Sequence, residues 1–239
     1  REYTTDDEFR KINWNATARM HKLITNTYDM EKSQNILLAI DVGRVMMGEA
    51  GGMSKLDHAI QAALVLAQVA MDKGDKVGLL VFHHEVKAFI KPDKGKGQME
   101  KILQTLYRLQ PEYYESDFRE MVAYLGAYQR KRSLVCIFSQ LTDEESGKEL
   151  ASVLGLLRER HAVLYVSLLN PGLRKIVDGP DMQLTDIYQK AAAVYRLKTE
   201  RETSERLLRM GIPNILAEPE GLTPQTVNRY LLMKKQMKV

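Results

Sequence analysis

The chain has 239 residues, of which 44% are hydrophobic and 28% are charged, and it contains 15 glycines and 7 prolines. This length allows one large or two small domains, and the composition excludes collagen-like, disordered and low-complexity chains. The 35 basic and 31 acidic residues give a net charge of +4, and residues 196–239, with nine basic and five acidic side chains, account for the whole excess.

Cysteine content and apolar run length narrow the class of protein further. A single cysteine excludes a disulfide framework, and because Cys136 lies in an apolar run we expect a buried thiol and a reducing compartment. The longest apolar runs, such as 62–67, reach about a third of the roughly 18 residues that a membrane helix needs, so the chain as given is expected to be soluble. The sequence begins at Arg1 without a signal-peptide pattern, which indicates a processed chain or a fragment.

Two regions differ in pattern. Residues 1–34 are dense in charge and show no helical or strand period, so we expect an N-terminal extension packed on the core through Trp14 and Tyr28. In residues 35–239, short β-branched runs alternate with stretches of 3.6-residue periodicity. This pattern predicts a single α/β domain with a doubly wound, mostly parallel, Rossmann-like sheet that has helices on both faces.

The strands are expected where apolar runs lack polar alternation, as in strands buried on both faces. These runs are residues 36–40, 77–82, 134–139 and 162–169. A short edge strand is expected over 86–90, and a last strand over 214–216.

The first helices have recognisable start signals. Ser54 is the expected N-cap of a helix that ends at Gly74, and Ser116 with Asp117 precedes a second helix. Ser146 is expected to open a third helix through a capping box.

Two helices are expected to close the chain. One spans 184–210, with a break near 198–203, and the other spans 224–233, with Thr223 as N-cap and Pro224 at its first position. The basic residues of the first helix have acidic residues at i,i+4 spacing. We therefore expect a solvated helix face rather than a nucleic-acid site.

Ligands of doubly wound sheets bind at the carboxyl ends of the strands, which directs attention to Asp41, Ser139 and Gln140. The loop 41–50 has two glycines at phosphate-loop spacing but lacks the lysine and hydroxyl residue that hold phosphate and metal, so we exclude nucleotide binding there. Residues 83–85 and 95–97 are expected to be turns. No histidine stands near a candidate nucleophile, and the sequence gives no support for an enzyme.

The N-terminal block carries a family resemblance. Its residues at the family's spacing are Arg1, Tyr3, Asp7, Arg10, Ile12, Trp14, Ala18, Arg19, Leu23 and Glu31. The chain resembles the MoxR-associated bacterial family of domain of unknown function number fifty-eight, whose core is similar to a von Willebrand factor A domain. The similarity continues through Asp41, residues 55–56, 74–78 and 160–163, whereas Thr5 and Asp6 stand where the family usually has Pro and Gly.

The resemblance implies a cellular setting. Family members usually carry two membrane-spanning helices upstream, so this chain would be the C-terminal part on the cytoplasmic face of the bacterial inner membrane. Their genes stand beside those of MoxR-type AAA ATPases, and their proposed role is that of scaffold or adaptor in assembly or maturation of other proteins. No enzymatic activity is implied.

The resemblance also implies where a metal would lie. Related domains often hold Mg²⁺ through an Asp-x-Ser-x-Ser loop, a threonine and a second aspartate. Here Asp41 matches the first position, Gly43 and Val45 replace the serines, Ser116 stands in for the threonine, and Gln140 occupies the place of the second aspartate. Because magnesium requires six oxygen ligands, we expect no cofactor and no tight metal binding.

The resulting hypothesis is a non-catalytic interaction domain whose loops 41–52, 112–118 and 139–145 contact a protein partner. The expected interaction surface comprises Arg44, Ser139, Gln140 and Asp143, with the Arg44 guanidinium taking the place of a cation beside Asp41. Two alternatives remain open. The same crevice could be a magnesium-dependent ligand- or protein-binding site, or Asp41 and Ser116 could serve only to stabilise their loop and cap a helix.

Overall fold

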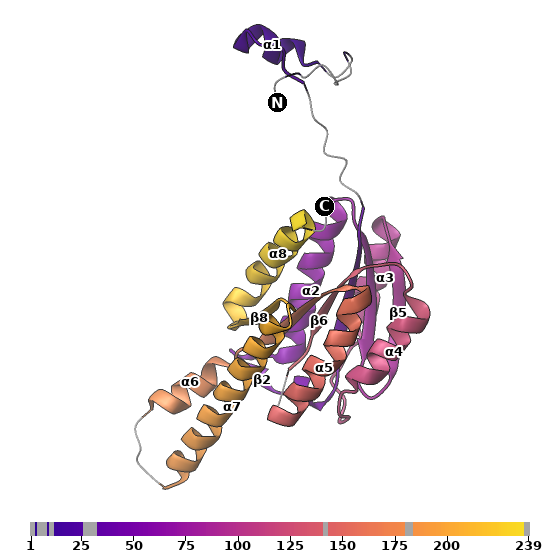
Figure 1. Cartoon of the computed structure of the whole chain (residues 1–239). Helices are drawn as coiled ribbons and strands as arrows, with labels where there is room; N and C mark the ends of the chain where they lie inside the picture. Colours follow the sequence, from indigo (N-terminus) through magenta and orange to yellow (C-terminus); the bar gives the residue numbers. More distant parts are fainter. Residues whose placement is uncertain are drawn as a thin grey trace. The chain divides into compact units, whose positions relative to one another are not determined.

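A computed structural model of the chain describes residues 3, 9, 12–25, 33–140, 143–179 and 184–236. It divides into two units, residues 1–32 and 33–239, and each is described by itself (Figure 1). The first unit contains α1 (Trp14–Met20), which no sequence period predicted; Asn13 caps it by accepting a hydrogen bond from the amide of Ala16 at 3.0 Å. Trp14 is 62% exposed. Tyr28 lies outside the described residues, and the packing of the extension on the core stays a prediction.

The second unit is built on a sheet. Its described strands are β1 (Asn35–Asp41), β4 (Lys76–Phe82), β5 (Val86–Asp93), β6 (Leu134–Phe138), β7 (Ala162–Leu168) and β8 (Asn214–Ala217). They lie in the order β5-β4-β1-β6-β7-β8, all parallel except β5, which runs antiparallel to β4 along one edge. This order, with the chain leaving β1 in one direction and returning on its other side at β6, confirms the doubly wound α/β fold.

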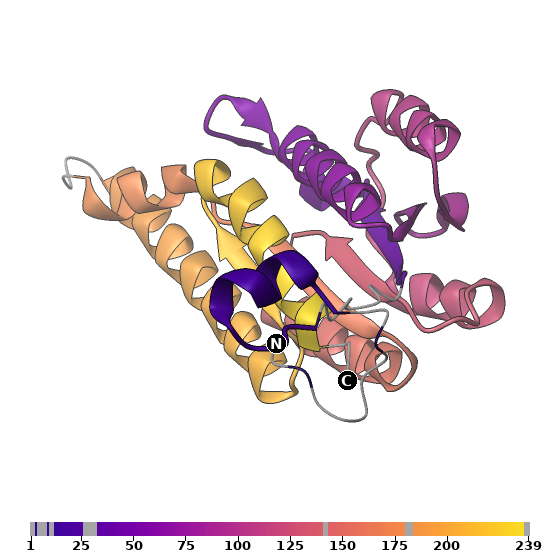
Figure 2. The same cartoon turned by 90° about the horizontal axis from the view of Figure 1, so that it is seen from above.

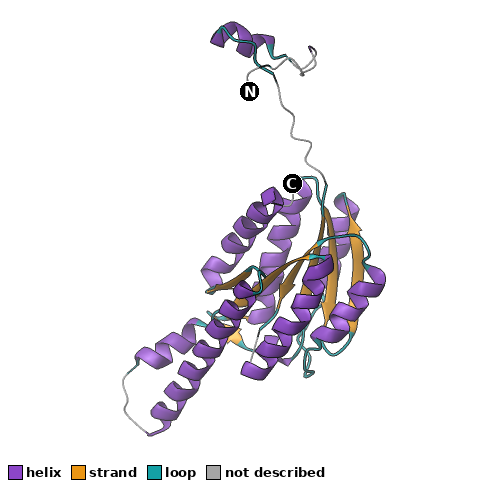
Figure 3. Cartoon of the chain, in the orientation of Figure 1, coloured by secondary structure: helices purple, strands orange, loops and turns teal. Residues whose placement is uncertain are grey.

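Helices cover both faces of the sheet (Figure 3). One face is covered by α2 (Lys55–Asp72), α3 (Lys96–Tyr107) and α8 (Pro219–Gln236), and the other by α4 (Phe118–Tyr128), α5 (Glu144–Arg160) and α7 (Leu184–Arg209). Strand β1 explains why two cores form. Ile36, Leu38 and Ile40 point into one core, while Leu37 and Ala39 point into the other, and all five are fully buried.

Smaller elements follow β1 and β7. A 3₁₀ turn, η2 (Arg44–Met46), precedes the short hairpin of β2 (Glu49–Ala50) and β3 (Met53–Ser54). Helix α6 (Pro171–Asp178) and the first half of α7 project away from the sheet as an arm inserted between β7 and β8 (Figures 1 and 2). Within the described residues, every helix is too short or too polar to cross a bilayer.

Two helix predictions were wrong at their starts, and a third included an internal break that the structure lacks. The N-cap of α5 is Asp143, whose carboxylate accepts a hydrogen bond from the amide of Ser146, so Ser146 lies in the first turn instead of capping it. Helix α7 is continuous and has no break. Helix α8 begins at Pro219, and Pro224 therefore stands inside it. Aspartate caps a helix as well as serine does, and both Pro219 and Pro224 suit the first turn of a helix. Local signals alone therefore could not choose between the alternative starts of α5 or of α8.

The turn expected at residues 95–97 is also a helix start. Gly95 is the N-cap of α3, and the two following residues belong to its first turn. Helix α3 as a whole had no counterpart among the predicted elements. The expected edge strand is longer than 86–90, since β5 extends to Asp93.

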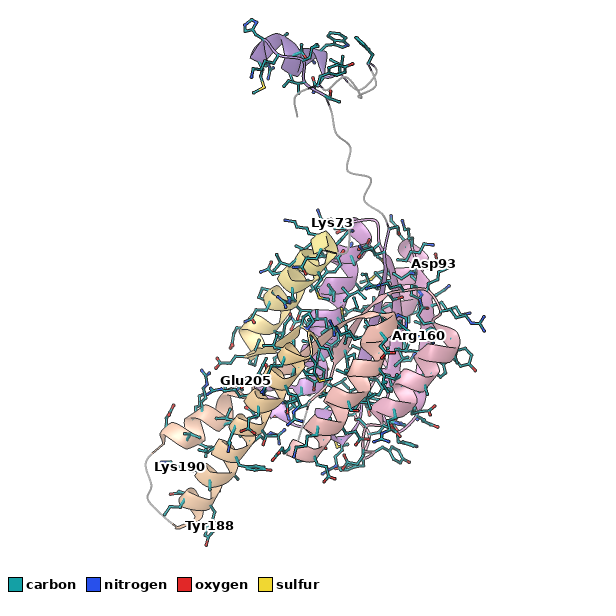
Figure 4. The ribbon with its side chains drawn as sticks, viewed as in Figure 1. Lys73, Asp93, Arg160, Tyr188, Lys190 and Glu205 are labelled. Carbon is teal, nitrogen blue, oxygen red and sulfur yellow. The ribbon has the colours of Figure 1, made fainter. Side chains whose placement is uncertain are left out.

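A buried ion pair holds α8 against the amino-terminal end of the sheet. Asp75, which is fully buried, accepts hydrogen bonds from Lys234 Nζ at 2.9 Å, from Tyr230 Oη at 2.6 Å and from the amide of Gln34 at 3.0 Å. Lys234 Nζ also donates to the carbonyl of Lys73 at 3.0 Å. Lys73 lies at the end of α2, where Figure 4 labels it. A buried pair with these additional hydrogen bonds fixes the position of the last helix.

Candidate functional site

The candidate site lies where the strand order reverses, between the carboxyl ends of β1 and β6. Asp41 is the last residue of β1 and is fully buried. Its Oδ1 accepts hydrogen bonds from the amide of Gly43 at 2.8 Å and from Ser116 Oγ at 2.6 Å, and its Oδ2 accepts one from Ser139 Oγ at 2.5 Å. The structure therefore brings together Asp41 and Ser139, which the sheet topology placed at this edge, and Ser116, which the family resemblance placed there.

The Asp41 carboxylate is held by neutral donors. Burial raises the pKa of Asp41, while the hydrogen bonds from Ser116, Ser139 and the Gly43 amide act in the opposite direction. The expected guanidinium is not among its hydrogen-bond donors. Arg44 instead bonds Glu115, with Nε at 3.0 Å from Oε1, so the prediction that Arg44 stands beside Asp41 was wrong.

Gly43 is a glycine because its surroundings leave no room for a side chain. A Cβ at this position would lie 2.3 Å from Ser116 Oγ and 2.8 Å from the carbonyl oxygen of Tyr114. Its φ of −73° is ordinary for any residue, so the constraint is steric and not conformational. The space of the first serine in the Asp-x-Ser-x-Ser pattern is thus filled by the hydroxyl of Ser116.

Gln140 uses its amide inside the protein. Its Nε2 donates to Glu200 Oε1 at 2.8 Å, and its Oε1 accepts from Ser167 Oγ and from the amide of Leu168, both at 3.3 Å. Gln140 therefore connects the end of β6 to β7 and to α7, and it is only 3% exposed. Ser139, 2% exposed and bonded to Asp41, is buried as well, which corrects its assignment to the interaction surface.

A cluster of buried charges beside Gln140 was missed from the sequence. Glu200 lies 3.5 Å from Arg196 Nε, and burial raises the pKa of Glu200. Burial also lowers the pKa of Lys55 to about 8, and the positive charge of Arg196 adds to this effect. The i,i+4 spacing of Arg196 and Glu200 was the one available signal; nothing local showed that this turn of α7 would be buried.

A cleft of about 350 Å³ opens in front of this network. Its lining residues come from the loops after β1 and β4, from the start of α4, from the end of β6 and from the first turns of α5. They are Val45, His84, Glu115, Ser116, Asp117, Phe118, Gln140, Ser146 and Glu149. Asp143, predicted to face a partner, lies at the start of α5, where it accepts the Ser146 amide at 2.8 Å.

The donors at this edge do not fit a magnesium ion. Asp41 is the only carboxylate of the predicted ligand set; it already accepts three hydrogen bonds, and Gly43 and Val45 offer no side-chain oxygen. Across the described residues, three or more His, Cys, Asp or Glu side chains nowhere gather as a metal-binding group. Magnesium is held in proteins through one or two carboxylates, and here the one carboxylate is already bonded by Ser116, Ser139 and the Gly43 amide.

Among the described residues, no arrangement of side chains points to catalysis. Cys136 is fully buried, and burial raises the pKa of its thiol to about 12, so it remains a thiol at neutral pH. Residues 83–85 form the turn between β4 and β5, as expected. The His83 ring is fully buried and stacks on His84 at 4.2 Å between ring centroids, and burial lowers the pKa of His83.

A solved structure supports the fold. The chain is similar to an aerotolerance-related membrane protein from Bacteroides fragilis, with 12% identity, a TM-score of 0.50, and coverage of 82% of this chain and 100% of that one. The SpRpn10 VWA domain aligns with 11% identity and a TM-score of 0.47, over 82% of this chain and 95% of that one. At 12% identity, the first of these structures bears on the fold alone.

A comparison with curated proteins gives no match. At the level of sequence families, the model described as "Protein of unknown function DUF58" matches residues 1–210, which is most of the chain and includes the N-terminal block as well as the sheet. The chain therefore belongs to the DUF58 family.

Proposed function

We propose that this chain is a non-catalytic protein-interaction domain. Its strand-tip loops, residues 41–52, 112–118 and 139–145, bind a partner without a metal ion. The observation that carries the proposal is the closed hydrogen-bond network of Asp41, in which Ser116 and Ser139 occupy the carboxylate that a metal would otherwise use. A network of neutral donors keeps the loops after β1 and β6 in one arrangement. A fixed arrangement of loops suits partner recognition, because less conformational entropy is lost on binding.

The partner we propose is a MoxR-type AAA ATPase, with this domain acting as adaptor or scaffold in assembly or maturation of other proteins. Membership of the DUF58 family and the resemblance given by the N-terminal block support this choice. On the same grounds we propose that the domain works at the cytoplasmic face of the bacterial inner membrane, tethered by an upstream segment.

The first experiment tests metal independence on the chain alone. Thermal unfolding is followed after EDTA treatment and desalting, and again with 10 mM Mg²⁺. A site that binds magnesium in the folded state would raise Tm with concentration, whereas we expect the two curves to coincide. A dose-dependent rise in Tm that Asp41→Asn abolishes would establish the magnesium-dependent alternative instead.

The second experiment tests the binding surface at constant magnesium, so that the nucleotide state of the ATPase does not change. Binding to the MoxR-type ATPase of the same genome, loaded with a non-hydrolysable nucleotide, is measured for Arg44→Glu and for Arg130→Glu. Arg44 lies in the strand-tip loops, whereas Arg130 is an exposed residue before the amino end of β6. We expect Arg44→Glu to change the affinity at least tenfold and Arg130→Glu less than twofold. Equal effects, or no binding by the unmodified chain, would refute the proposal.

A further inference from the structure

The strand-tip cleft has walls suited to a long side chain with an apolar stem. Val45 and Phe118 provide apolar surface, and the exposed His84 provides a ring that contacts both His83 and Tyr114, with centroids at 4.2 Å from each. An aliphatic stem gains free energy from contact with such walls while its polar head stays near water. The shape and surface of the cleft therefore favour an amphipathic side chain.

The charge of the cleft selects the head group. Glu115, Asp117 and Glu149 line it, and its described lining residues include no lysine or arginine. The two segments that surround it, residues 112–120 and 143–149, each have four acidic and one basic side chain, a net charge of −3 apiece. The chain as a whole carries +4, so this face opposes the overall charge. Such a local field attracts cations and repels anions.

The carboxylates of the cleft can exchange their present ion-pair partners for another cation. Glu115 pairs with Arg44, and Glu149 pairs with Arg119 at 2.6 Å, but these side chains are between 48% and 73% exposed. Exposed ion pairs contribute little, typically below about 1 kcal/mol, because water and salt screen them. An incoming cation that also packs on the cleft walls can therefore share or replace the existing partners.

We propose that the cleft binds an arginine side chain of a protein partner, which deepens the proposed function by giving the chemistry of what the strand-tip loops recognise. The guanidinium stacks on the His84 ring and bonds the carboxylates of Glu115 and Glu149, while its methylenes contact Val45 and Phe118. Arginine is preferred to lysine because its planar head both stacks on rings and binds carboxylates through two parallel hydrogen bonds.

The test uses short peptides and the whole chain. Backbone amide shifts of the ¹⁵N-labelled chain are followed by NMR during titration with acetyl-Gly-Arg-Gly-amide, with its lysine counterpart, and with its glutamate counterpart. We expect saturable shifts confined to residues 115–118 and 146–149, at millimolar affinity for arginine, several-fold weaker for lysine, and absent for glutamate.

Two matched variants separate the cleft from general electrostatics. Glu149→Gln removes a cleft carboxylate that is 48% exposed and paired with an arginine, and Glu202→Gln removes one on α7 that is 52% exposed and paired with Lys198. We expect Glu149→Gln to weaken arginine binding at least threefold and Glu202→Gln to leave it unchanged.

Shifts that do not saturate, equal binding of lysine, or equal effects of the two variants would overturn the arginine assignment. These outcomes leave the Arg44→Glu experiment on the ATPase unaffected. Conversely, saturable arginine binding with no ATPase binding would retain the cleft and reject the proposed partner, so the two failures are distinguishable.

Discussion

Replacing Gly43 by alanine is the most direct test of why the metal-binding pattern is absent. The added Cβ would lie 2.3 Å from Ser116 Oγ, 2.8 Å from the Tyr114 carbonyl oxygen and 3.1 Å from Asp41 Oδ1. Alanine adopts the backbone angles of this position without strain. The cost therefore comes from displacing the loop that carries Tyr114 and from lengthening the hydrogen bond between Ser116 and Asp41.

We expect Gly43→Ala to lower the free energy of unfolding by about 1–3 kcal/mol, the usual range for overpacking a well-filled site. For a domain of this size, about 2 kcal/mol corresponds to a decrease in Tm of roughly 4–8 °C. Urea denaturation monitored by circular dichroism gives the free energy, and a thermal scan gives Tm. The matched control is Gly97→Ala in α3, where an added Cβ meets nothing within 4 Å. There alanine should stabilise by about 0.5–1 kcal/mol, because glycine is a poor helix former.

A double-mutant cycle identifies the cause. Ser116→Ala removes the contact at 2.3 Å but leaves the Tyr114 carbonyl in place, so the double variant should be less unstable than the sum of the two single variants. A Gly43→Ala protein as stable as the parent, or strictly additive variants, would refute the conclusion that Ser116 occupies the space of the missing serine.

Three further predictions concern buried groups. Lys234→Met leaves the Asp75 carboxylate buried without its charged partner, so it should cost about 3 kcal/mol in urea denaturation, whereas the exposed Lys235→Met should stay within about 0.5 kcal/mol. Because the pKa of Lys55 is lowered to about 8 in the folded protein, the unfolded chain binds more protons above that pH. The stability of the parent relative to Lys55→Met should then rise from pH 8 to pH 10, and a flat difference would contradict the burial of this amine. Cys136 should be inert to a thiol reagent such as dithionitrobenzoate in the native protein and react fully in 6 M guanidinium chloride; rapid native reaction would show an open core.

The sheet was predictable because local apolar runs in the sequence identify its strands. The run 36–40 has no polar alternation, and the structure buries it between two cores, as that pattern requires. Helix ends were less predictable. Asp143 and Ser146 can both cap, and only the position of α5 on the sheet decides which does.

The site was predictable only in part, because its contacts join distant parts of the chain. The topology of parallel strands placed Asp41 and Ser139 at one edge, and the structure shows them bonded. The blocking of Gly43 by Ser116 depends on a loop more than 70 residues away, and the burial of Glu200 depends on how α7 packs. Sequence spacing does not encode such packing, so Lys55 and Glu200 were missed and Arg44 was misplaced.

The two edges of the sheet limit how a partner can attach. Strand β8 has four residues, and β5 has Lys87, Lys91 and Pro92 along an irregular register with β4. Short strands, lysines and proline prevent a foreign strand from extending a sheet by backbone pairing. Recognition of this domain therefore depends on side chains of its loops and helices. A point mutation in a partner can then change specificity, whereas binding by backbone pairing of strands would tolerate it.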